Sequence, residues 1–443
     1  MTSKHYLSLI RSLAIILLFG IETSCISVQE NYLGNSVNDR KNLVFSTIPS
    51  AKEKQILQKK VDSLLLVISE EKRQGYYLRA CEINQLYDYF GKQLKNDRYY
   101  NEVLTKNPIR TDSLSNEQYQ AVVELLTSAR YYQNTYQKER KVRRILNRGD
   151  RGNNIPVEIL AKSRNFLYSP SVRKTLESNF LRYYSPEMDR LFNQLPETNT
   201  CIALNNRAFR NNDRLHTFFY NSVYFGSYAV GNSIGLFHES TNRKQNADIL
   251  RSKLQPFDLV LMKSSRHLTD QFIPGYFGHV GIWLGNELAA QLRGKAMVKD
   301  SIKGRAMVEV LRSGVKISTL RDFADGEIFL IVRPKNLSGE LKRKILSNIR
   351  KQLGKDYDFN FDIESSEAVT CTELVYLSYD FIDWKTRHVW LRVTLSPDDL
   401  VITALTNPQF EIPVLVENGV ITNHPVPISI RSLVGEQDTL SSH

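Results

Sequence analysis

The sequence predicts an α+β protein in which an all-helical domain precedes a domain of short antiparallel strands with flanking helices. Two observations support this fold class. Between residues 45 and 215 apolar residues recur at helical spacing. From about residue 250 onward, short apolar runs bounded by Gly, Pro, Asn or Ser are followed by helix patterns. The length of 443 residues is sufficient for two or three domains.

The chain begins with a segment typical of exported proteins. Lys4 and Arg11 precede the nine-residue apolar run Leu13–Ile21, which is too short to span a bilayer as a helix. A basic start followed by such a run is typical of a signal peptide. We therefore expect residues 1–24 to be a signal peptide, and the protein to lie in the cell envelope, periplasmic or on the outer surface.

The four cysteines differ in expected role. Cys25 follows small residues and resembles the lipid-carrying cysteine of a bacterial lipoprotein, which would anchor the protein to a membrane. Glu22 stands where that motif prefers Leu, so simple secretion and a retained anchor stay open. Cys81 is expected in the middle of a helix on its apolar face, and its pairing with Cys201 is left open. Cys371 remains as a thiol that an oxidising compartment would leave unpaired.

Helix-start signals and apolar residues at helical spacing indicate helices in the first half of the chain. After a linker at 25–44, the helical domain is expected at 45–215. One helix face is predicted by five apolar residues at helical spacing: Leu57, Val61, Leu64, Leu65 and Ile68. Further helix starts are predicted at a capping box, Ser115 with Gln118, and at two Ser-Pro pairs, Ser169-Pro170 and Ser185-Pro186.

The second half carries the strand pattern. A connector at 216–249 leads to the α+β domain, expected at 250–402, and residues 403–443 form a strand-and-loop extension. Four strands are predicted, at 257–262, 279–284, 307–311 and 327–332. A helix is expected from its Ser338 cap to Gly354, and a second helix near Cys371.

The net positive charge of the protein favours binding to anionic surfaces but does not identify which surface. The net charge is +12, and +11 of it lies outside residues 1–24. The densest basic run, residues 138–151, is interpreted as a solvated helix face and loop. No nucleic-acid-binding motif accompanies it, so no nucleic-acid partner is expected. No cofactor or metal is expected either, because His-Glu-x-x-His, paired Cys-x-x-Cys and a phosphate-binding glycine loop do not occur.

Cys371 is the strongest candidate for a reactive group. Thr370 and Glu373 form a Thr-x-x-Glu capping box, which places Cys371 in the first turn of a helix. Free backbone N–H groups and the helix dipole favour a thiolate there. An inert small residue at a helix start would show the same local pattern.

A thiolate nucleophile needs a base, and His279 is the best candidate among eight histidines. In the run Gly278-His-Val-Gly-Ile-Trp-Leu-Gly285, alternation places His279 on the face opposite Val280, and Gly281 beside it leaves room for another group to approach. The following strand carries Glu309. If the two strands pair antiparallel, the Glu309 carboxylate can hold the imidazole.

These segments together resemble a known family. The runs His279-Val-Gly-Ile-Trp-Leu-Gly, Val308-Glu-Val-Leu-Arg-Ser-Gly-Val315 and Cys371-Thr-Glu-Leu-Val-Tyr376 are similar to the circularly permuted branch of the NlpC-type papain-like cysteine hydrolases, the YiiX/YebB-like group. Gly354-Lys-Asp-Tyr-Asp-Phe359 and Ser396-Pro-Asp-Asp-Leu400 also match. The resemblance covers about a third of the chain. It implies a permuted papain-like domain, an antiparallel sheet or small barrel with flanking helices.

The resemblance also implies roles for the candidate residues. Cys371 would be the nucleophile, His279 the general base and acid, and Glu309 the group that orients His279. Asn286–Arg305 is longer than in short family members, so Gln291 is the fallback third member. Where the family usually has Pro-Gly-Asp, this chain has Pro256-Phe257-Asp258, which is expected to alter the floor of the cleft.

The predicted function is an exported thiol hydrolase, an amidase or peptidase that acts on cell-wall peptides or lipid-linked amides through an acyl-enzyme. An acyltransferase of the same fold and a non-catalytic envelope lipoprotein that binds lipid or wall fragments are the alternatives. A serine esterase is also weighed, because Gly231-Asn-Ser233-Ile-Gly235 matches a nucleophile elbow. That motif lacks the strand before it and the βαβ alternation that an esterase requires. The oligomeric state is not predicted.

Overall fold

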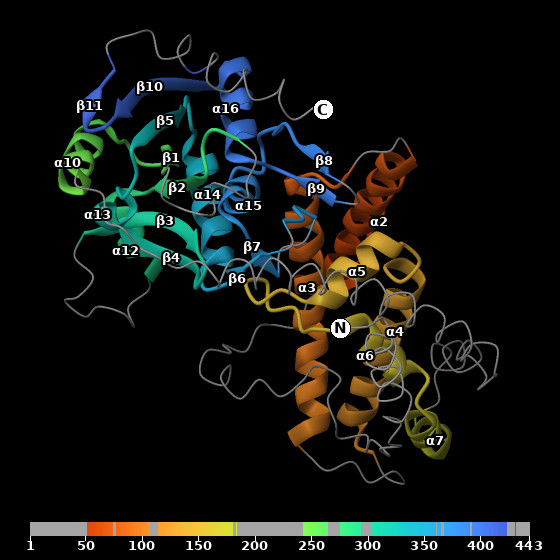
Figure 1. The fold of residues 1–443 in the computed structure, drawn as a ribbon. Coiled ribbons are helices and arrows are strands. Elements are labelled where there is room, and N and C mark those ends of the chain that lie inside the picture. Colours follow the sequence, from red (N-terminus) through yellow and green to blue (C-terminus); the bar gives the residue numbers. More distant parts are fainter. Residues whose placement is uncertain are drawn as a thin grey trace, which may run out of the picture.

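The computed structural model of the protein describes residues 51–73, 77–106, 114–179, 183, 242–264, 275–293, 304–359, 361–364, 367–389, 392–422 and 430. A helical region and a region built on a β-sheet lie side by side (Figure 1). The predicted α+β class is therefore confirmed. None of the helices in the described ranges combines the length and apolar character needed to cross a membrane. The expected signal peptide, Cys25 and Cys201 lie outside the described residues.

The helical region contains six described helices: α2 (Ala51–Arg73), α3 (Ala80–Lys106), α4 (Asn116–Thr135), α5 (Arg140–Arg148), α6 (Ile159–Leu167) and α7 (Pro170–Asn179). Helix α2 buries Val61, Leu64 and Ile68, as their spacing predicted. The capping box at Ser115 begins α4, with both of its hydrogen bonds formed. Helix α7 begins at Pro170, whereas the second Ser-Pro pair, at 185–186, lies outside the described residues.

The second region is built on a seven-stranded antiparallel sheet with the order β11-β10-β5-β1-β2-β3-β4. Its strands are β1 (Leu259–Lys263), β2 (His279–Trp283), β3 (Arg305–Leu311), β4 (Gly314–Thr319), β5 (Ile328–Pro334), β10 (Phe410–Glu417) and β11 (Val420–Ile421). Alternate residues of each strand enter different apolar clusters. Leu259 and Leu261 belong to one cluster, and Val260 and Met262 belong to the other. The sheet is therefore buried on both faces.

Helices cover the two faces. One cluster contains residues of α14 (Gly339–Gln352) and α15 (Cys371–Ser378), and the other contains residues of α10 (Arg243–Lys253) and α13 (Leu320–Phe323). Helices α12 (Gly285–Arg293) and α16 (Pro397–Thr406) and the short pairs β6–β7 (Asp356–Tyr357, Ala368–Val369) and β8–β9 (Arg387–Val389, Arg392–Thr394) complete this region. Helix α14 begins at its Ser338 cap, as predicted.

Three strands of the seven-stranded sheet were not predicted individually. Strand β4 follows β3 through the two-residue turn Arg312-Ser313, with Gly314 at φ +91°. Strand β10 pairs with β5, and β11 pairs with β10. The sheet therefore continues past residue 402, into the segment that the sequence assigned to an extension.

The helical region and the sheet region share one core. The apolar cluster that contains α14 and α15 continues into α3 and α4. Asn84 of α3 donates through Nδ2 to the Leu377 carbonyl and to Asp380 Oδ2, at 3.0 Å each. Lys355 Nζ lies 2.6 Å from Asp150 Oδ2, and both side chains are at most 1% exposed. These buried polar contacts fix the helical region against the end of α15 and against the segment between α14 and β6.

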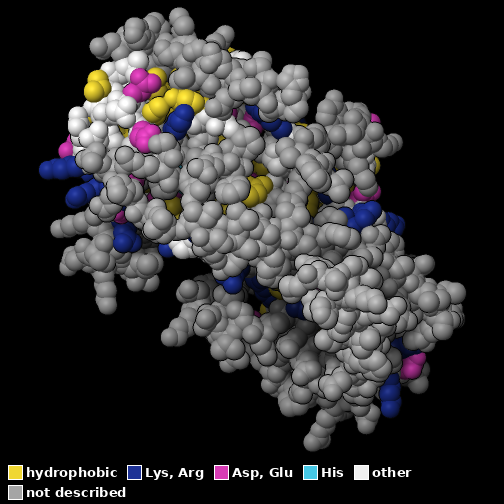
Figure 2. Space-filling model, viewed as in Figure 1, with side chains coloured by type: hydrophobic (Ala, Val, Ile, Leu, Met, Phe, Trp, Pro, Cys, Tyr) yellow, Lys and Arg dark blue, Asp and Glu magenta, His cyan; other side chains and the backbone are white. Residues whose placement is uncertain are grey.

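The basic run at 138–151 is solvated only in part: Lys138, Arg140 and Arg151 are exposed, as the sequence interpretation expected, but other basic residues of the run contact the rest of the fold. Lys141 forms an ion pair with Glu364, and Arg148 Nη1 lies 3.9 Å from Asp362 Oδ2. Arg143 is 2% exposed and donates to the Gln137 carbonyl. The run is basic because it faces carboxylates of the sheet region that are more than 200 residues away in the sequence. On the face seen in Figure 2, the described Lys and Arg side chains lie at several separate places on both regions.

Candidate active site

Helix α15 lies along β2 with matched ends. Its first residue, Cys371, interacts with His279, the first residue of β2. After its last turn, the Tyr379 hydroxyl donates to the Phe257 carbonyl at 2.8 Å, and Phe257 N–H donates to the carbonyl of Trp283, the last residue of β2. From first to last residue, the eight-residue helix rises about 10 Å and the five-residue strand about 13 Å. This match brings the thiol and the imidazole together.

The start of α15 is held by the predicted capping box. Thr370 Oγ1 accepts from Glu373 N–H at 3.2 Å, and Glu373 Oε2 accepts from Thr370 N–H at 2.8 Å. Cys371 is therefore the first helical residue, and its side chain is 4% exposed. Its backbone N–H has no hydrogen-bond partner among the described residues, as expected for the first turn of a helix. The site thus combines a thiol with an N–H group free to bind an oxygen.

The strand register places Glu309 beside His279. Strands β2 and β3 pair antiparallel, with Gly281 opposite Glu309, so His279 and Glu309 are diagonal neighbours on the same face. His279 Nε2 lies 3.0 Å from Glu309 Oε2. The segment between the two strands, longer than in short relatives, does not prevent their pairing. The carboxylate is 4% exposed and the imidazole 15%, so water screens this contact only weakly.

The imidazole lies between two anionic partners. Burial alone would lower the pKa of His279. Hydrogen bonds to Cys371 and Glu309, and the negative charges of both groups, outweigh burial and raise this pKa to about 10. Because Nε2 is engaged by Glu309, the nitrogen that faces Cys371 is Nδ1. At neutral pH the arrangement therefore favours the protonated imidazolium form of His279.

The order of these groups along the chain, with the histidine strand before the cysteine helix, is that of a permuted papain-like site. Residues 253–420 match the family model described as permuted papain-like amidase enzymes, YaeF/YiiX, of the C92 family. This part of the chain is therefore similar to the permuted papain-like amidases, which are cysteine hydrolases. Searches of curated proteins and of solved structures gave no match.

The space beside Gly281 in the amidase domain is filled, contrary to the expectation that it admits another group. A Cβ at this position would lie 2.8 Å from Met307 Sδ and 2.8 Å from Phe323 Cε2. The Phe323 ring packs against the His279 ring at 5.6 Å between centroids. Gly281 therefore allows Phe323 to cover the imidazole. Phe323 was not singled out, because it lies forty-four residues after His279 in a four-residue helix.

A second residue missed by sequence reasoning is Asp398, in the first turn of α16. Its carboxylate accepts from Tyr276 N–H at 2.5 Å and from Phe277 N–H at 2.9 Å, just before His279. The side chain is 3% exposed. Burial raises the pKa of Asp398, although these two hydrogen bonds oppose the shift. Asp398 therefore fixes the backbone that enters β2. The motif containing it was recognised, but its partner was not.

Two side chains near the start of α15, those of Glu373 and Tyr357, have raised pKa values. Burial and the charge of Asp358 raise the pKa of Glu373 well above its usual range. Tyr357 of β6 pairs with Val369 of β7, two residues before Cys371. Burial and the charge of Cys371 raise the pKa of the Tyr357 hydroxyl. Both groups are thus favoured in their neutral forms near the thiol.

Phe257, which stands where the resembling family usually has Gly, lies away from the His279 end of the site. Phe257 adopts φ +76°, a conformation that favours glycine, and lies at the opposite end of β2. The neighbouring Asp258 is fully buried and receives two hydrogen bonds from Arg333, at 2.9 and 2.8 Å. Burial raises the pKa of Asp258, and Arg333 opposes this shift. The segment anchors β1 to β5 instead of forming the floor beside the thiol.

The remaining candidates are placed as follows. Gln291, the fallback third member, lies exposed on α12, where its carbonyl accepts from Arg350. Glu309 occupies the position beside His279 instead. Ser233, of the possible esterase motif, lies outside the described residues. Cys81 is the second residue of α3 and half-buried, so its expected place in mid-helix is wrong. Within the described residues, no group of three or more His, Cys, Asp or Glu side chains could hold a metal ion.

Proposed function

We propose that the protein is an exported cysteine amidase in which Cys371 is the nucleophile, His279 the general base and acid, and Glu309 the residue that orients His279. The position of the His279 imidazole between Cys371 and Glu309 carries this proposal. Glu309 holds Nε2, which directs Nδ1 to the thiol and stabilises the imidazolium. The same three groups form the arrangement of nucleophile, base and orienting residue that acyl transfer requires.

In the proposed reaction, Cys371 Sγ attacks the carbonyl carbon of an amide and forms a C–S bond. The tetrahedral intermediate collapses as the C–N bond breaks, and the Nδ1 proton of His279 goes to the leaving amine. Neutral His279 then takes a proton from water, whose oxygen attacks the thioester carbonyl. The carboxylic acid leaves, and the proton on Nδ1 restores the thiolate–imidazolium pair.

The developing oxyanion would be bound by the backbone N–H of Cys371. This group lies at the start of α15 and is free of described partners. The partial positive charge of the helix start adds to the same effect. One such donor lowers the barrier by about 3 kcal/mol in comparable sites.

The proposed substrates are amides in the cell envelope, either cell-wall peptides or lipid-linked amides. The signal-like segment before Cys25, the lipoprotein-like position of Cys25 and the net charge of +12 support this location. We further propose that Cys25 carries lipid and anchors the protein to a membrane. Incorporation of a labelled fatty acid that is lost in Cys25→Ser would support the anchor. Equal incorporation in both proteins would exclude it.

The mechanism is tested by trapping the acyl-enzyme. The full-length protein is incubated with a panel of acylated peptides and lipid amides, quenched in acid and digested, and the Cys371 peptide is searched for acyl adducts by mass spectrometry. We expect an adduct that is absent in Cys371→Ala, strongly reduced in His279→Ala and retained in the control Cys81→Ala. Turnover that persists in Cys371→Ala would overturn the assignment.

A further inference from the structure

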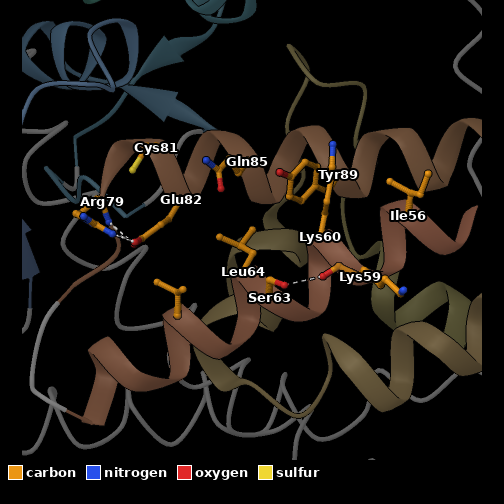
Figure 3. Close-up of a pocket in the computed structure, with 11 residues that line it drawn as sticks. Ile56, Lys59, Lys60, Ser63, Leu64, Arg79, Cys81, Glu82, Gln85 and Tyr89 are labelled. Carbon is orange, nitrogen blue, oxygen red and sulfur yellow. Dashed lines mark hydrogen bonds and ion pairs between the residues drawn. The ribbon is translucent and has the colours of Figure 1, made fainter. Parts of the chain in front are cut away.

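A groove between α2 and α3 lies outside the candidate active site. It has a volume of about 510 Å³, within the range of small-molecule sites. Cys81, Gln85 and Tyr89 follow one face of α3 at a spacing of four residues, and Figure 3 shows them beside side chains of α2 such as Leu64. The eight steps from Cys81 to Tyr89 correspond to about 12 Å of helix. The groove is therefore elongated along the two helices.

One side of the groove is apolar. It is formed by Ile56, Leu64 and Val67 of α2, which we call the apolar wall. Leu64 is 6% exposed at the bottom, whereas Ile56 and Val67 are 46% and 44% exposed along the groove. A ligand that covers such side chains removes apolar surface from water, which lowers the free energy. These three side chains offer a peptide backbone no hydrogen-bond partners, so an apolar chain fits the wall better than a peptide does.

The charges of the groove are mainly positive. Lys59, Lys60 and Arg79 line it together with a single carboxylate, that of Glu82. Arg79 Nη2 is held by Glu82 at 2.6 Å and by Glu71 at 2.9 Å. The two lysines are exposed on α2. The free positive charge is therefore on Lys59 and Lys60, beside an apolar surface.

We propose that this groove binds one acyl chain of an anionic phospholipid, whose phosphate is held by Lys59 and Lys60. The apolar wall would cover the chain, and the two ammonium groups would select an anionic head group over a zwitterionic one. The groove is about 12 Å long. This approaches the depth of one leaflet, which is half of a hydrocarbon core of about 30 Å. This site does not depend on hydrolysis at Cys371.

The thiol of Cys81 provides a direct readout, because it lies in the lining of the groove. In full-length Cys371→Ala protein, alkylation of Cys81 by iodoacetamide is followed by mass spectrometry of its peptide. The probes are palmitoyl lysophosphatidylglycerol, palmitoyl lysophosphatidylcholine and glycerol phosphate. At a concentration ten times its Kd, the anionic lipid should slow alkylation about tenfold by mass action. The zwitterionic lipid should protect less, and glycerol phosphate should not protect.

Two variants with matched controls test the residues. Val67→Glu places a charge on the apolar wall, and its control is Leu66→Glu, a residue 69% exposed on α2 that does not line the groove. Lys60→Glu reverses a charge in the groove, and its control is Lys52→Glu on the same helix. Protection should be lost in Val67→Glu and Lys60→Glu and retained in both controls. Equal protection by both lipids, protection by glycerol phosphate alone, or no protection would overturn the proposal.

Discussion

Two helices of this protein begin with similar local structure but present their cysteines to different surroundings. At the start of α3, Arg79 N–H donates to Glu82 Oε2 at 2.9 Å. At the start of α15, Thr370 N–H donates to Glu373 Oε2 at 2.8 Å. Each first turn contains a cysteine: Cys81 is the second residue of α3 and Cys371 the first residue of α15.

The difference lies in what the rest of the fold brings to each thiol. Burial and the Glu82 carboxylate raise the pKa of Cys81, and Arg79 opposes them only in part. None of the groups acting on this pKa is an imidazole. Cys371 instead faces His279, which a neighbouring strand delivers. A helix start therefore positions a thiol, whereas its reactivity depends on a second element.

The largest expected effect is that His279→Ala removes the difference in alkylation rate between Cys371 and Cys81. Removal of the imidazole should slow alkylation of Cys371 by iodoacetamide at pH 7 by roughly 10²- to 10⁴-fold, the range of general acid–base effects. Alkylation of Cys81 in the same molecule should not change. The two peptides are quantified together by mass spectrometry. An unchanged rate at Cys371 would show that the imidazole does not activate the thiol.

The contact between the two regions can be broken without changing either helix start. Asp150→Asn removes the carboxylate that pairs with the buried Lys355, which should lower the free energy of unfolding by about 3–5 kcal/mol. Asp88→Asn, in the exposed pair with Lys92, is the control and should cost no more than about 1 kcal/mol. Urea unfolding of full-length proteins measures both. Equal small losses would show that the Asp150–Lys355 pair does not hold the regions together.

A smaller effect is expected when the charge beside His279 is removed and the shape is kept. Glu309→Gln should lower the pKa of His279 by roughly one to three, because an adjacent carboxylate stabilises the imidazolium by that amount. NMR titration of the imidazole, or the alkaline limb of the activity profile, measures the shift. Glu309→Asp should restore part of it, whereas Glu373→Gln, at the helix cap, should not reproduce it.

The smallest effect expected is a difference in pH dependence between the two thiols. Alkylation of Cys81 should increase between pH 7 and 10, because its thiol pKa is raised. Amide hydrolysis should fall as the pH passes about 10, where His279 loses the proton needed by the leaving amine. A raised histidine pKa stabilises the fold fully below about 6.5, and this contribution is lost as the pH rises through about 10. Parallel pH profiles for Cys81 alkylation and for amide hydrolysis would contradict this comparison.

The site was predictable where its signals are local. The box Thr370–Glu373 determines the start of α15 within four residues, and alternation in β2 assigns the face of His279. The pairing of β2 with β3 stayed conditional at the level of sequence, because a long segment separates the two strands, and the structure shows that it forms. The contacts of Asp398 and Phe323 could not be predicted in the same way, because the segments that hold them meet His279 only in the folded chain.

The same limit explains the errors in the rest of the fold. Strand β10 carries Pro413 between its apolar residues, and its partner β5 lies about eighty residues earlier. The basic run at 138–151 has the composition of a solvated helix, but its carboxylate partners are near residue 364. Composition indicates whether a segment is charged, whereas only the assembled regions show whether water or a counter-ion meets the charge.

The permuted order has a consequence for protein synthesis. Because the chain emerges from its N-terminus, the helical region and the β2–β3 pair leave the ribosome before Cys371 does. A nascent chain with fewer than about 371 residues therefore contains His279 without Cys371. Asp398, which holds the backbone before His279, follows later still, and β10 then completes the sheet beside β5. In the proposed mechanism, an unfinished chain thus lacks its nucleophile until the segments around the base have already been made.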